Sequence, residues 1–107
     1  MTGIETLLQD LRTESNGIGL VTGAKAVADD RLKIQYALLF VAAPPGTVAE
    51  RDAWVKRQDD YIKAVDEKQN AYADFTTKSA TINRLKIEIE VWRSDSANNR
   101  AMDRLHR

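Results

Sequence analysis

The first apolar pattern of the chain lies at its N-terminus. Four apolar residues follow one another there at helical spacing: Ile4, Leu7, Leu8 and Leu11. Thr2 precedes Glu5 by three residues, which is the spacing of a capping box, and the pattern predicts a short helix over residues 3–13. Residues 15–17 read Ser-Asn-Gly and predict a break, because asparagine and glycine tolerate the left-handed conformation in which helices end.

A second apolar pattern predicts a helix over residues 20–43. Its apolar members alternate steps of three and four residues, as in a heptad seam, with one step spanning a polar residue: Leu20, Ala24, Val27, Ile34, Leu38 and Val41. The polar member of this stripe is Arg31. Pro44-Pro45-Gly46 follows the helix and should end it, because proline removes a backbone donor and disfavours helix in the residue before it.

The longest pattern follows Thr47, which lies three residues before Glu50 and predicts a second capping box. From residue 48 to the end there is neither proline nor glycine. A seven-residue repeat runs along this segment, with the polar Lys68 in one of its slots: Trp54, Tyr61, Lys68, Phe75, Ile82 and Ile89. Further apolar residues widen this stripe: Val65, Tyr72, Leu85 and Trp92. We therefore expect one helix over about 48–104, with a possible kink at 76–81, where hydroxyl residues lower the helix propensity.

Composition agrees with an all-α fold in a single domain, 1–107, because the chain holds only five glycines and two prolines. The absence of cysteine favours a reducing compartment. The N-terminus does not resemble a secretory signal, and the longest apolar run, Ala37–Ala43, is far shorter than the ~20 residues that cross a bilayer. We expect a cytoplasmic protein with no membrane partner.

The predicted lengths suggest self-association. In a helical hairpin, a helix over 20–43 covers only the first half of a helix over 48–104. The short helix over 3–13 can cover only part of the rest. Five apolar residues would then largely lack an intrachain partner: Phe75, Ile82, Leu85, Ile89 and Trp92. An apolar stripe of this length is normally buried. We expect these residues to form the interface of a homo-oligomeric bundle, with helices either parallel or antiparallel.

Catalytic and cofactor motifs are missing from the sequence. His106 is the only histidine and stands one residue from the C-terminus, where nothing orients it. Residues 17–23 contain three glycines but lack the spacing and the preceding strand of a dinucleotide loop, and they are interpreted as a loop before a helix. We expect no enzyme activity, no cofactor, no metal site and no small-molecule substrate.

Charge is balanced over the whole chain but not along it. The net charge is zero, yet residues 83–107 hold six basic and four acidic side chains. Five basic residues of this segment fall within roughly a 60° arc of one helix: Lys86, Arg93, Arg100, Arg104 and Arg107. Such a row suits a phosphate backbone or an acidic groove. Alternatively, these residues flank the apolar seam and pair with acids of a neighbouring helix. Trp92 is suited either to the core or to stacking on a base.

The same segment carries a resemblance. Ile89-Glu90-Val91-Trp92-Arg93-Ser94, followed by Ala97-Asn98-Asn99-Arg100-Ala101-Met102, resembles the closing motif of a family of short helical bacteriophage proteins. These proteins often end in a Trp-Arg-Ser/Thr run, then Ala-Asn, then Arg-Ala-Glu-Met. The segment Gly46-Thr47-Val48-Ala49-Glu50-Arg51 is similar to a start found in related phage proteins. Asp103 after Ala101-Met102 departs from the usual ending.

The resemblance implies a place in phage replication and recombination gene modules. We expect a non-catalytic, oligomeric accessory factor of DNA recombination that binds single-stranded DNA or a DNA-bound recombination protein. The basic row from Lys86 to Arg107 would carry the nucleic-acid contact. The alternative is a protein–protein interaction module without nucleic-acid binding, such as an inhibitor of a host enzyme or a structural assembly factor.

Overall fold

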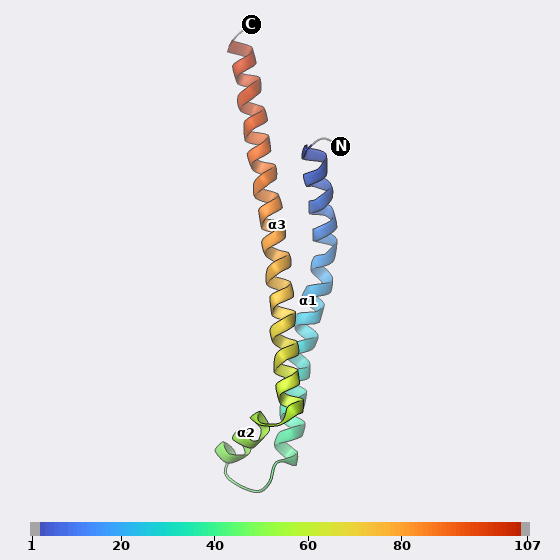
Figure 1. The fold of residues 1–107 in the computed structure, drawn as a ribbon, viewed down its shortest axis with the longest axis vertical. Helices are drawn as coiled ribbons and strands as arrows, with labels where there is room; N and C mark the ends of the chain where they lie inside the picture. Colours follow the sequence, from blue (N-terminus) through green and yellow to red (C-terminus); the bar gives the residue numbers. More distant parts are fainter. Residues whose placement is uncertain (1–2, 106–107) are drawn as a thin grey trace. The chain divides into compact units, whose positions relative to one another are not determined.

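The structure, a computed structural model, describes residues 3–105 and consists of helices joined by short connections (Figure 1). Within that range it contains α1 (Gly3–Ala42), α2 (Val48–Lys56) and α3 (Asp59–Leu105), and no strand. The all-α prediction is confirmed. The chain divides into two compact units, the first drawn from residues 1–19 and 77–107 and the second comprising residues 20–76. Thr2, His106 and Arg107 lie outside the described residues.

Helix α1 passes through residues 15–17 without interruption, so the predicted break there, and the predicted loop over 17–23, are wrong. No glycine in the described chain has a positive φ. Gly17 faces α3, and a Cβ atom at this position would lie 3.2 Å from the Lys78 Nζ atom. That Nζ atom forms an ion pair with Glu14 at 2.8 Å. The missing side chain therefore makes room for a lysine that crosses the helix surface, which is a packing role and not a turn.

The connection after α1 follows the predicted signals. Helix α1 ends at Ala42, just before the two prolines. Thr47 is the N-cap of α2, and its hydroxyl oxygen accepts a hydrogen bond from the Glu50 backbone N–H at 3.2 Å. The same hydroxyl donates to the Glu50 carboxylate at 3.2 Å. The predicted helix start at residue 48 is confirmed, because the cap satisfies a backbone donor that has no partner within the helix.

The predicted single helix over 48–104 is interrupted at residues 57–58. The backbone N–H of Arg57 donates to the Trp54 carbonyl at 3.2 Å, and the Gln58 side-chain amide donates to the same oxygen at 2.7 Å. These hydrogen bonds cap the C-terminal end of α2. Helix α3 then begins with two acidic residues, Asp59 and Asp60, where the positive end of the helix dipole stabilises negative charge. Residues 76–81, the predicted place of a kink, belong to the uninterrupted α3.

Helix α2 closes one end of the second unit, beside the end of α1 (Figure 1). Val55 is fully buried there. The Arg51 guanidinium lies 4.5 Å from the centre of the Phe40 ring and donates to the Phe40 carbonyl at 2.6 Å. The Tyr36 hydroxyl donates to Asp52 at 2.6 Å. Backbone, ring and charge contacts thus fix the turn between α1 and α3 in addition to the apolar contact.

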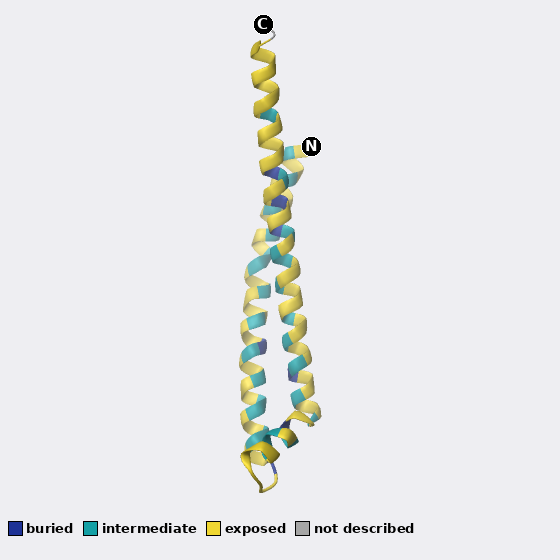
Figure 2. Cartoon of the chain, turned by 90° about the vertical axis from the view of Figure 1, so that its left-hand side faces the viewer, coloured by how far each residue is buried: buried dark blue, intermediate teal, exposed yellow. Residues whose placement is uncertain are grey.

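Two stripes with heptad spacing run along α1 in the second unit. The outer stripe is the one that the sequence predicted as the seam, and all its members are exposed: Leu20, Ala24, Val27, Arg31, Ile34, Leu38 and Val41. The inner stripe begins one residue later, and all its members are buried or half-buried: Val21, Lys25, Ala28, Leu32, Gln35 and Leu39 (Figure 2). One residue is a rotation of about 100°. The fold therefore uses the inner stripe, and the predicted choice of seam is wrong.

The core of the first unit lies between the start of α1 and the second half of α3. Half-buried apolar residues of α1 contribute one side of it: Ile4, Leu7, Leu11 and Ile18. On α3, Ile82, Leu85 and Ile89 retain only 9%, 2% and 3% of their accessible surface. The spacing of these three residues in the sequence correctly predicted one apolar face of a helix.

Candidate functional site

Three of the five residues of the predicted oligomer interface are buried inside a single chain. Ile82, Leu85 and Ile89 are buried within the first unit, where residues 3–19 of α1 provide the other half of the core. The prediction that they face another copy is wrong. It failed because α1 does not end near residue 13, so the chain itself supplies the helix that covers them.

The two remaining residues of that set differ from each other. Phe75 is half-buried in the second unit, where the Lys25 Nζ atom lies 4.4 Å from the centre of its ring and 4.7 Å from that of Tyr72. A cation above aromatic faces is an attractive contact. Trp92, in the first unit, keeps 42% of its surface exposed. Trp92 is therefore the member of the predicted set best placed to contact a partner.

The predicted basic row begins beside the core of the first unit. Lys86 and Arg93 help to line a shallow groove between the start of α1 and α3, together with Leu8, Leu11, Ile89 and Glu90. The Arg93 guanidinium pairs with Glu90 at 3.1 Å, and both side chains are mostly exposed. A pair this exposed to solvent contributes little to stability. The guanidinium of Arg93 therefore remains accessible to a stronger anionic partner.

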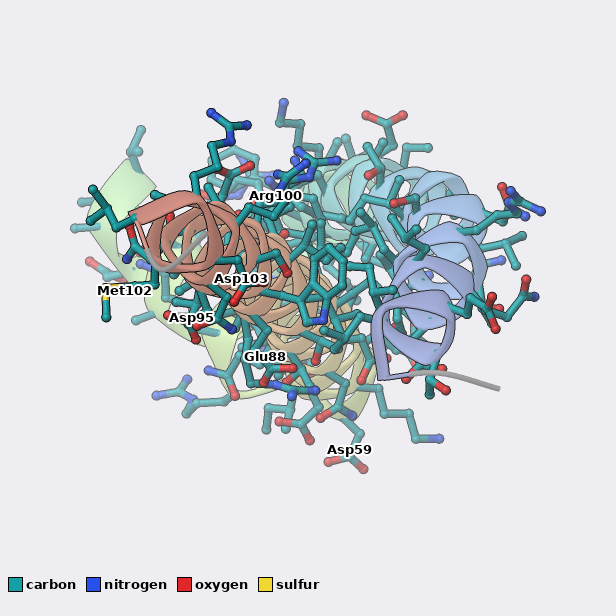
Figure 3. The ribbon with its side chains drawn as sticks, turned by 90° about the horizontal axis from the view of Figure 1, so that it is seen from above. Asp59, Glu88, Asp95, Arg100, Met102 and Asp103 are labelled. Carbon is teal, nitrogen blue, oxygen red and sulfur yellow. The ribbon has the colours of Figure 1, made fainter. Side chains whose placement is uncertain are left out.

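The row continues onto the last turns of α3, here called the C-terminal arm (residues 93–105). All residues of the arm except Ser96 are exposed. The Arg100 Nε atom donates to the Ser96 carbonyl at 3.3 Å, and neither Arg100 nor Arg104 forms an ion pair within residues 3–105. Figure 3 shows the side chains of Arg100 and Asp95 on opposite sides of α3. The row's last member, Arg107, lies outside the described residues.

These positions define what the arm can do chemically. Lys86, Arg93 and Arg100 are separated by seven residues each, and Arg104 follows one turn later, so they share one side of α3. Guanidinium groups donate fork-shaped hydrogen bonds to phosphate or carboxylate oxygens. The arrangement suits an extended anion that lies along the helix.

The seam of the second unit contains a polar cluster that the sequence reading missed. Asp29 accepts a hydrogen bond from the Tyr72 hydroxyl at 2.9 Å and pairs with the Lys68 Nζ atom at 3.4 Å. The Tyr72 hydrogen bond, followed by Lys68, lowers the pKa of the Asp29 carboxyl, although partial burial opposes the effect. The signal in the sequence was Lys68, a polar residue in an otherwise apolar seven-residue repeat. Its place in the seam is explained by the aspartate opposite.

We predict that this cluster makes folding stability sensitive to acid. Because the pKa of Asp29 is lower in the folded than in the unfolded chain, its contribution is fully present at neutral pH. It is lost as the pH falls below about 4, the ordinary value of an aspartate, and through the lower pKa of the folded state. Tyr72→Phe removes the largest cause of the shift. The variant should be less stable than the wild type at pH 7 and should lose less stability on acidification, as measured by urea unfolding at neutral and acidic pH.

A second hydrogen-bonded carboxylate, Asp52, provides a comparison for this prediction. The hydrogen bond from Tyr36 is the largest cause of its lowered pKa, and Lys56 is the next. Tyr36→Phe should reduce the acid sensitivity by a separate, additive amount, because the two carboxylates share no partner. An unchanged pH dependence in Tyr72→Phe would contradict the assigned role of Asp29.

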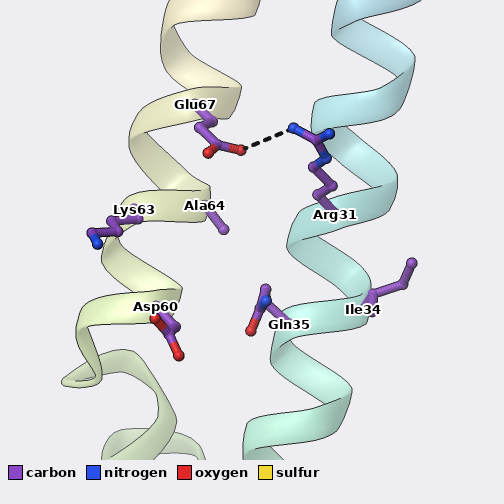
Figure 4. Close-up of a pocket in the computed structure, with 7 residues that line it drawn as sticks. All are labelled: Arg31, Ile34, Gln35, Asp60, Lys63, Ala64 and Glu67. Atoms are coloured by element: carbon purple, nitrogen blue, oxygen red, sulfur yellow. Dashed lines mark ion pairs between the residues drawn. The ribbon is translucent and has the colours of Figure 1, made fainter.

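The outer stripe of α1, in the second unit, was predicted to be a packed seam but lies on the surface. The outer stripe of α1 is solvent-exposed and lies beside a groove whose other wall is α3 (Figure 4). Across this groove the Arg31 guanidinium approaches Glu67 at 3.8 Å. The heptad spacing was visible in the sequence, but the exposure of the stripe was not.

Residues 3–105 contain no group of three or more histidine, cysteine, aspartate or glutamate side chains arranged to hold a metal ion. In the same range, no helix combines the length and the apolar composition that a membrane crossing requires.

The fold and its surfaces define an all-α protein whose two units are each built on packing between α1 and α3, with charged and apolar surface along the helices. Comparison of the chain with protein-family models, with characterised proteins and with solved structures gave no significant match.

Proposed function

We propose that this chain is a non-catalytic accessory factor of bacteriophage DNA recombination or replication in the host cytoplasm. It acts as an oligomer, and its C-terminal arm binds single-stranded DNA or a protein bound to that DNA. The observation that carries the proposal is the exposure of residues 93–105 together with a row of basic residues on one side of α3. Nucleic-acid backbones are recognised by such exposed lysine and arginine side chains.

The position of the phage-like motif supports the same surface. Part of the motif that carries the resemblance, Trp92-Arg93-Ser94 and Ala97 to Met102, lies at the start of the arm and within it. Trp92 is 42% exposed beside Arg93. An exposed indole offers a flat apolar face on which an unpaired base stacks, and a neighbouring guanidinium binds the adjacent phosphate. This combination favours single-stranded over double-stranded DNA.

The charge distribution limits how the protein binds. With a net charge of zero, the chain as a whole does not attract nucleic acid. Binding therefore depends on the arm and involves few phosphates. Each phosphate neutralised on a single strand contributes about 0.7 to the slope of log affinity against log salt. We expect a small slope that is set by Lys86 and the arginines of the arm.

The test is fluorescence anisotropy with a labelled single-stranded oligonucleotide at several salt concentrations. The triple variant Arg93→Ala, Arg100→Ala, Arg104→Ala should bind at least about tenfold more weakly at low salt, and its salt slope should fall by about 2, because three phosphate contacts are lost. Its helicity should be unchanged, since all three side chains are exposed.

The matched control changes the same number of charges elsewhere. Lys33, Arg57 and Lys63 are exposed in the second unit, and their replacement by alanine alters net charge equally. The control should keep the wild-type slope. An equal loss in both triple variants would assign binding to net charge and not to the arm, and no binding by the wild type at low salt would leave the DNA-binding half of the proposal without basis.

A protein–protein interaction module is the second candidate, as an inhibitor of a host enzyme or as a structural assembly factor without nucleic-acid binding. The exposed outer stripe of α1 favours it, because a heptad seam packs against another helix. The anisotropy experiment separates the two candidates, since this one requires no affinity for the oligonucleotide.

A further inference from the structure

The outer stripe of α1 has the spacing of a coiled-coil seam but lies in solvent. From Leu20 to Val41 its steps alternate between four and three residues without an exception. Its large apolar side chains are exposed by 80% at Leu20, 49% at Val27, 57% at Ile34, 62% at Leu38 and 80% at Val41. Isolated exposed aliphatic residues are ordinary, but five on one face at heptad spacing form a continuous apolar surface.

The one charged member of the stripe is directed away from its centre. The Arg31 guanidinium approaches Glu67 of α3 at 3.8 Å. Figure 4 shows Arg31 turned towards Glu67, whereas Ile34 points away from α3. The aliphatic stem of Arg31 remains on the stripe, as is common for long basic side chains. An approaching helix therefore meets an apolar surface whose one charged group lies at its edge, in a weak and mostly exposed contact with Glu67.

We propose that this stripe binds the same stripe of a second copy, with the two α1 helices antiparallel. The proposal gives the oligomeric part of the proposed function a surface and an orientation. A parallel pair in register would bring Arg31 of both copies into one layer, which like charges disfavour. The antiparallel pair avoids this, because Arg31 then lies opposite Ile34 of the second copy.

One antiparallel register pairs every member of the stripe except Leu20, which lies beyond the end of the second helix. With Arg31 opposite Ile34, Val27 lies opposite Leu38 and Ala24 opposite Val41. The last two pairs each combine a smaller with a larger apolar side chain, so their layers alternate in the manner of knobs and holes. On one flank of the stripe, Gly23 has open space where a Cβ atom would lie, which allows a second helix to approach. From Ala24 to Val41 the stripe is thus complementary to itself.

Charge and size indicate how strong the contact is. The net charge is zero, so no long-range repulsion keeps two copies apart. At 1.5 Å per residue the paired part of the stripe, residues 24–41, is about 26 Å long. A single pair of helices of that length gives an interface at the low end of specific protein contacts. We expect a dimer that dissociates on the order of micromolar concentration and not a permanent assembly.

The first test is the molar mass in solution, measured by analytical ultracentrifugation over a wide range of protein concentration without nucleic acid. The wild type should change from monomer to dimer as concentration rises. Leu38→Glu places a charge in the stripe and should remain monomeric. The matched control is Ile87→Glu on α3, whose parent residue is 64% exposed, against 62% for Leu38. This control should dimerise as the wild type does.

Because both residues are exposed, neither change should alter the helix content measured by circular dichroism. A wild type that stays monomeric at every concentration overturns the proposal. So does a Leu38→Glu variant that dimerises normally. Higher oligomers that depend on Ile87 would place the contact on α3 and overturn it as well.

The second test fixes the orientation. The chain has no cysteine, so single cysteines report contacts without interference. On oxidation, an equal mixture of Val27→Cys and Leu38→Cys should form the mixed disulfide. Two copies of the same variant should not cross-link. In the antiparallel pair, the same residue of the two copies lies about 16 Å apart along the helices, beyond the reach of a disulfide. Efficient cross-linking of Val27→Cys to itself shows a parallel pair and overturns the proposed orientation.

Both tests are independent of the C-terminal arm. If the dimer fails but the oligonucleotide binds through Arg93, Arg100 and Arg104, only the self-association is wrong. If the dimer forms but no oligonucleotide binds, the DNA-binding half of the proposed function is wrong and the dimer stands.

Discussion

Replacing Leu85 by alanine will destabilise the protein by about 2–5 kcal/mol. Leu85 retains 2% of its surface in the core of the first unit, between neighbours Ile82 and Ile89 that are almost equally buried. The substitution removes apolar contacts and leaves a cavity that two packed helices close only in part. Because the helix that covers this core belongs to the same chain, the loss should not depend on protein concentration.

Urea unfolding at two protein concentrations measures this effect, and hydrogen exchange at the backbone amides of residues 3–19 locates it. Those amides should exchange faster in the variant, since the start of α1 loses its packing partner. Ile87→Ala is the control, because Ile87 lies two residues away on α3 and is 64% exposed, and it should change stability by about 0.5 kcal/mol or less. A loss that vanishes at high protein concentration would show that Leu85 packs between copies, contrary to the structure.

The sequence predicted those parts of the fold that depend on local chemistry. The end of α1 before the prolines and the Thr47 cap of α2 follow from backbone donors and their partners, which neighbouring residues determine. The burial of Ile82, Leu85 and Ile89 follows from their spacing. The interruption at 57–58 had a local signal as well, since Asp59 and Asp60 are typical of a first helical turn, but the absence of proline and glycine outweighed it.

The sequence did not predict which stripe of α1 faces α3. The two stripes differ by one residue, and hydrophobicity alone favours the outer one, because the inner stripe contains Lys25 and Gln35. Lys25 belongs in the seam because its ammonium lies over the rings of Tyr72 and Phe75. Such a contact joins residues about fifty positions apart, so it is invisible until both helices are placed. The more apolar stripe is left exposed to solvent.

For the candidate site too, the sequence predicted what depends on local spacing and not what depends on tertiary packing. The spacing of the basic row in the sequence already placed Lys86, Arg93, Arg100 and Arg104 on one side of a helix. The exposure of the arm depends on where α1 begins beside α3, which is a tertiary property. A break at residues 15–17 would leave the second half of α3 without a covering helix, and the predicted interface at Ile82, Leu85 and Ile89 depends on that break, which the structure lacks.

Asn16→Pro will destabilise the protein by about 3 kcal/mol or more, because proline inside a helix removes a backbone hydrogen bond and its ring clashes with the carbonyl four residues earlier. Asn16 is exposed in the interior of α1, more than three turns from its start, so the change affects the backbone and leaves the packed side chains untouched. Circular dichroism should show a loss of helix, and the amides of residues 3–19 should lose protection from exchange. The expected cause is a broken α1 that no longer holds its first turns against Leu85 and Ile89.

Asn16→Ala is the control for the same position, because it removes the same side chain but keeps the backbone donor. Alanine has the higher helix propensity, so this variant should match or slightly exceed the wild type in stability. The pair also decides between the structure and the local reading of the sequence. In a loop at residues 15–17, proline would be tolerated and the two variants would unfold at similar urea concentrations. A large difference between them shows that α1 runs unbroken and that its packing against α3 outweighs the preference of Ser15, Asn16 and Gly17 for a turn.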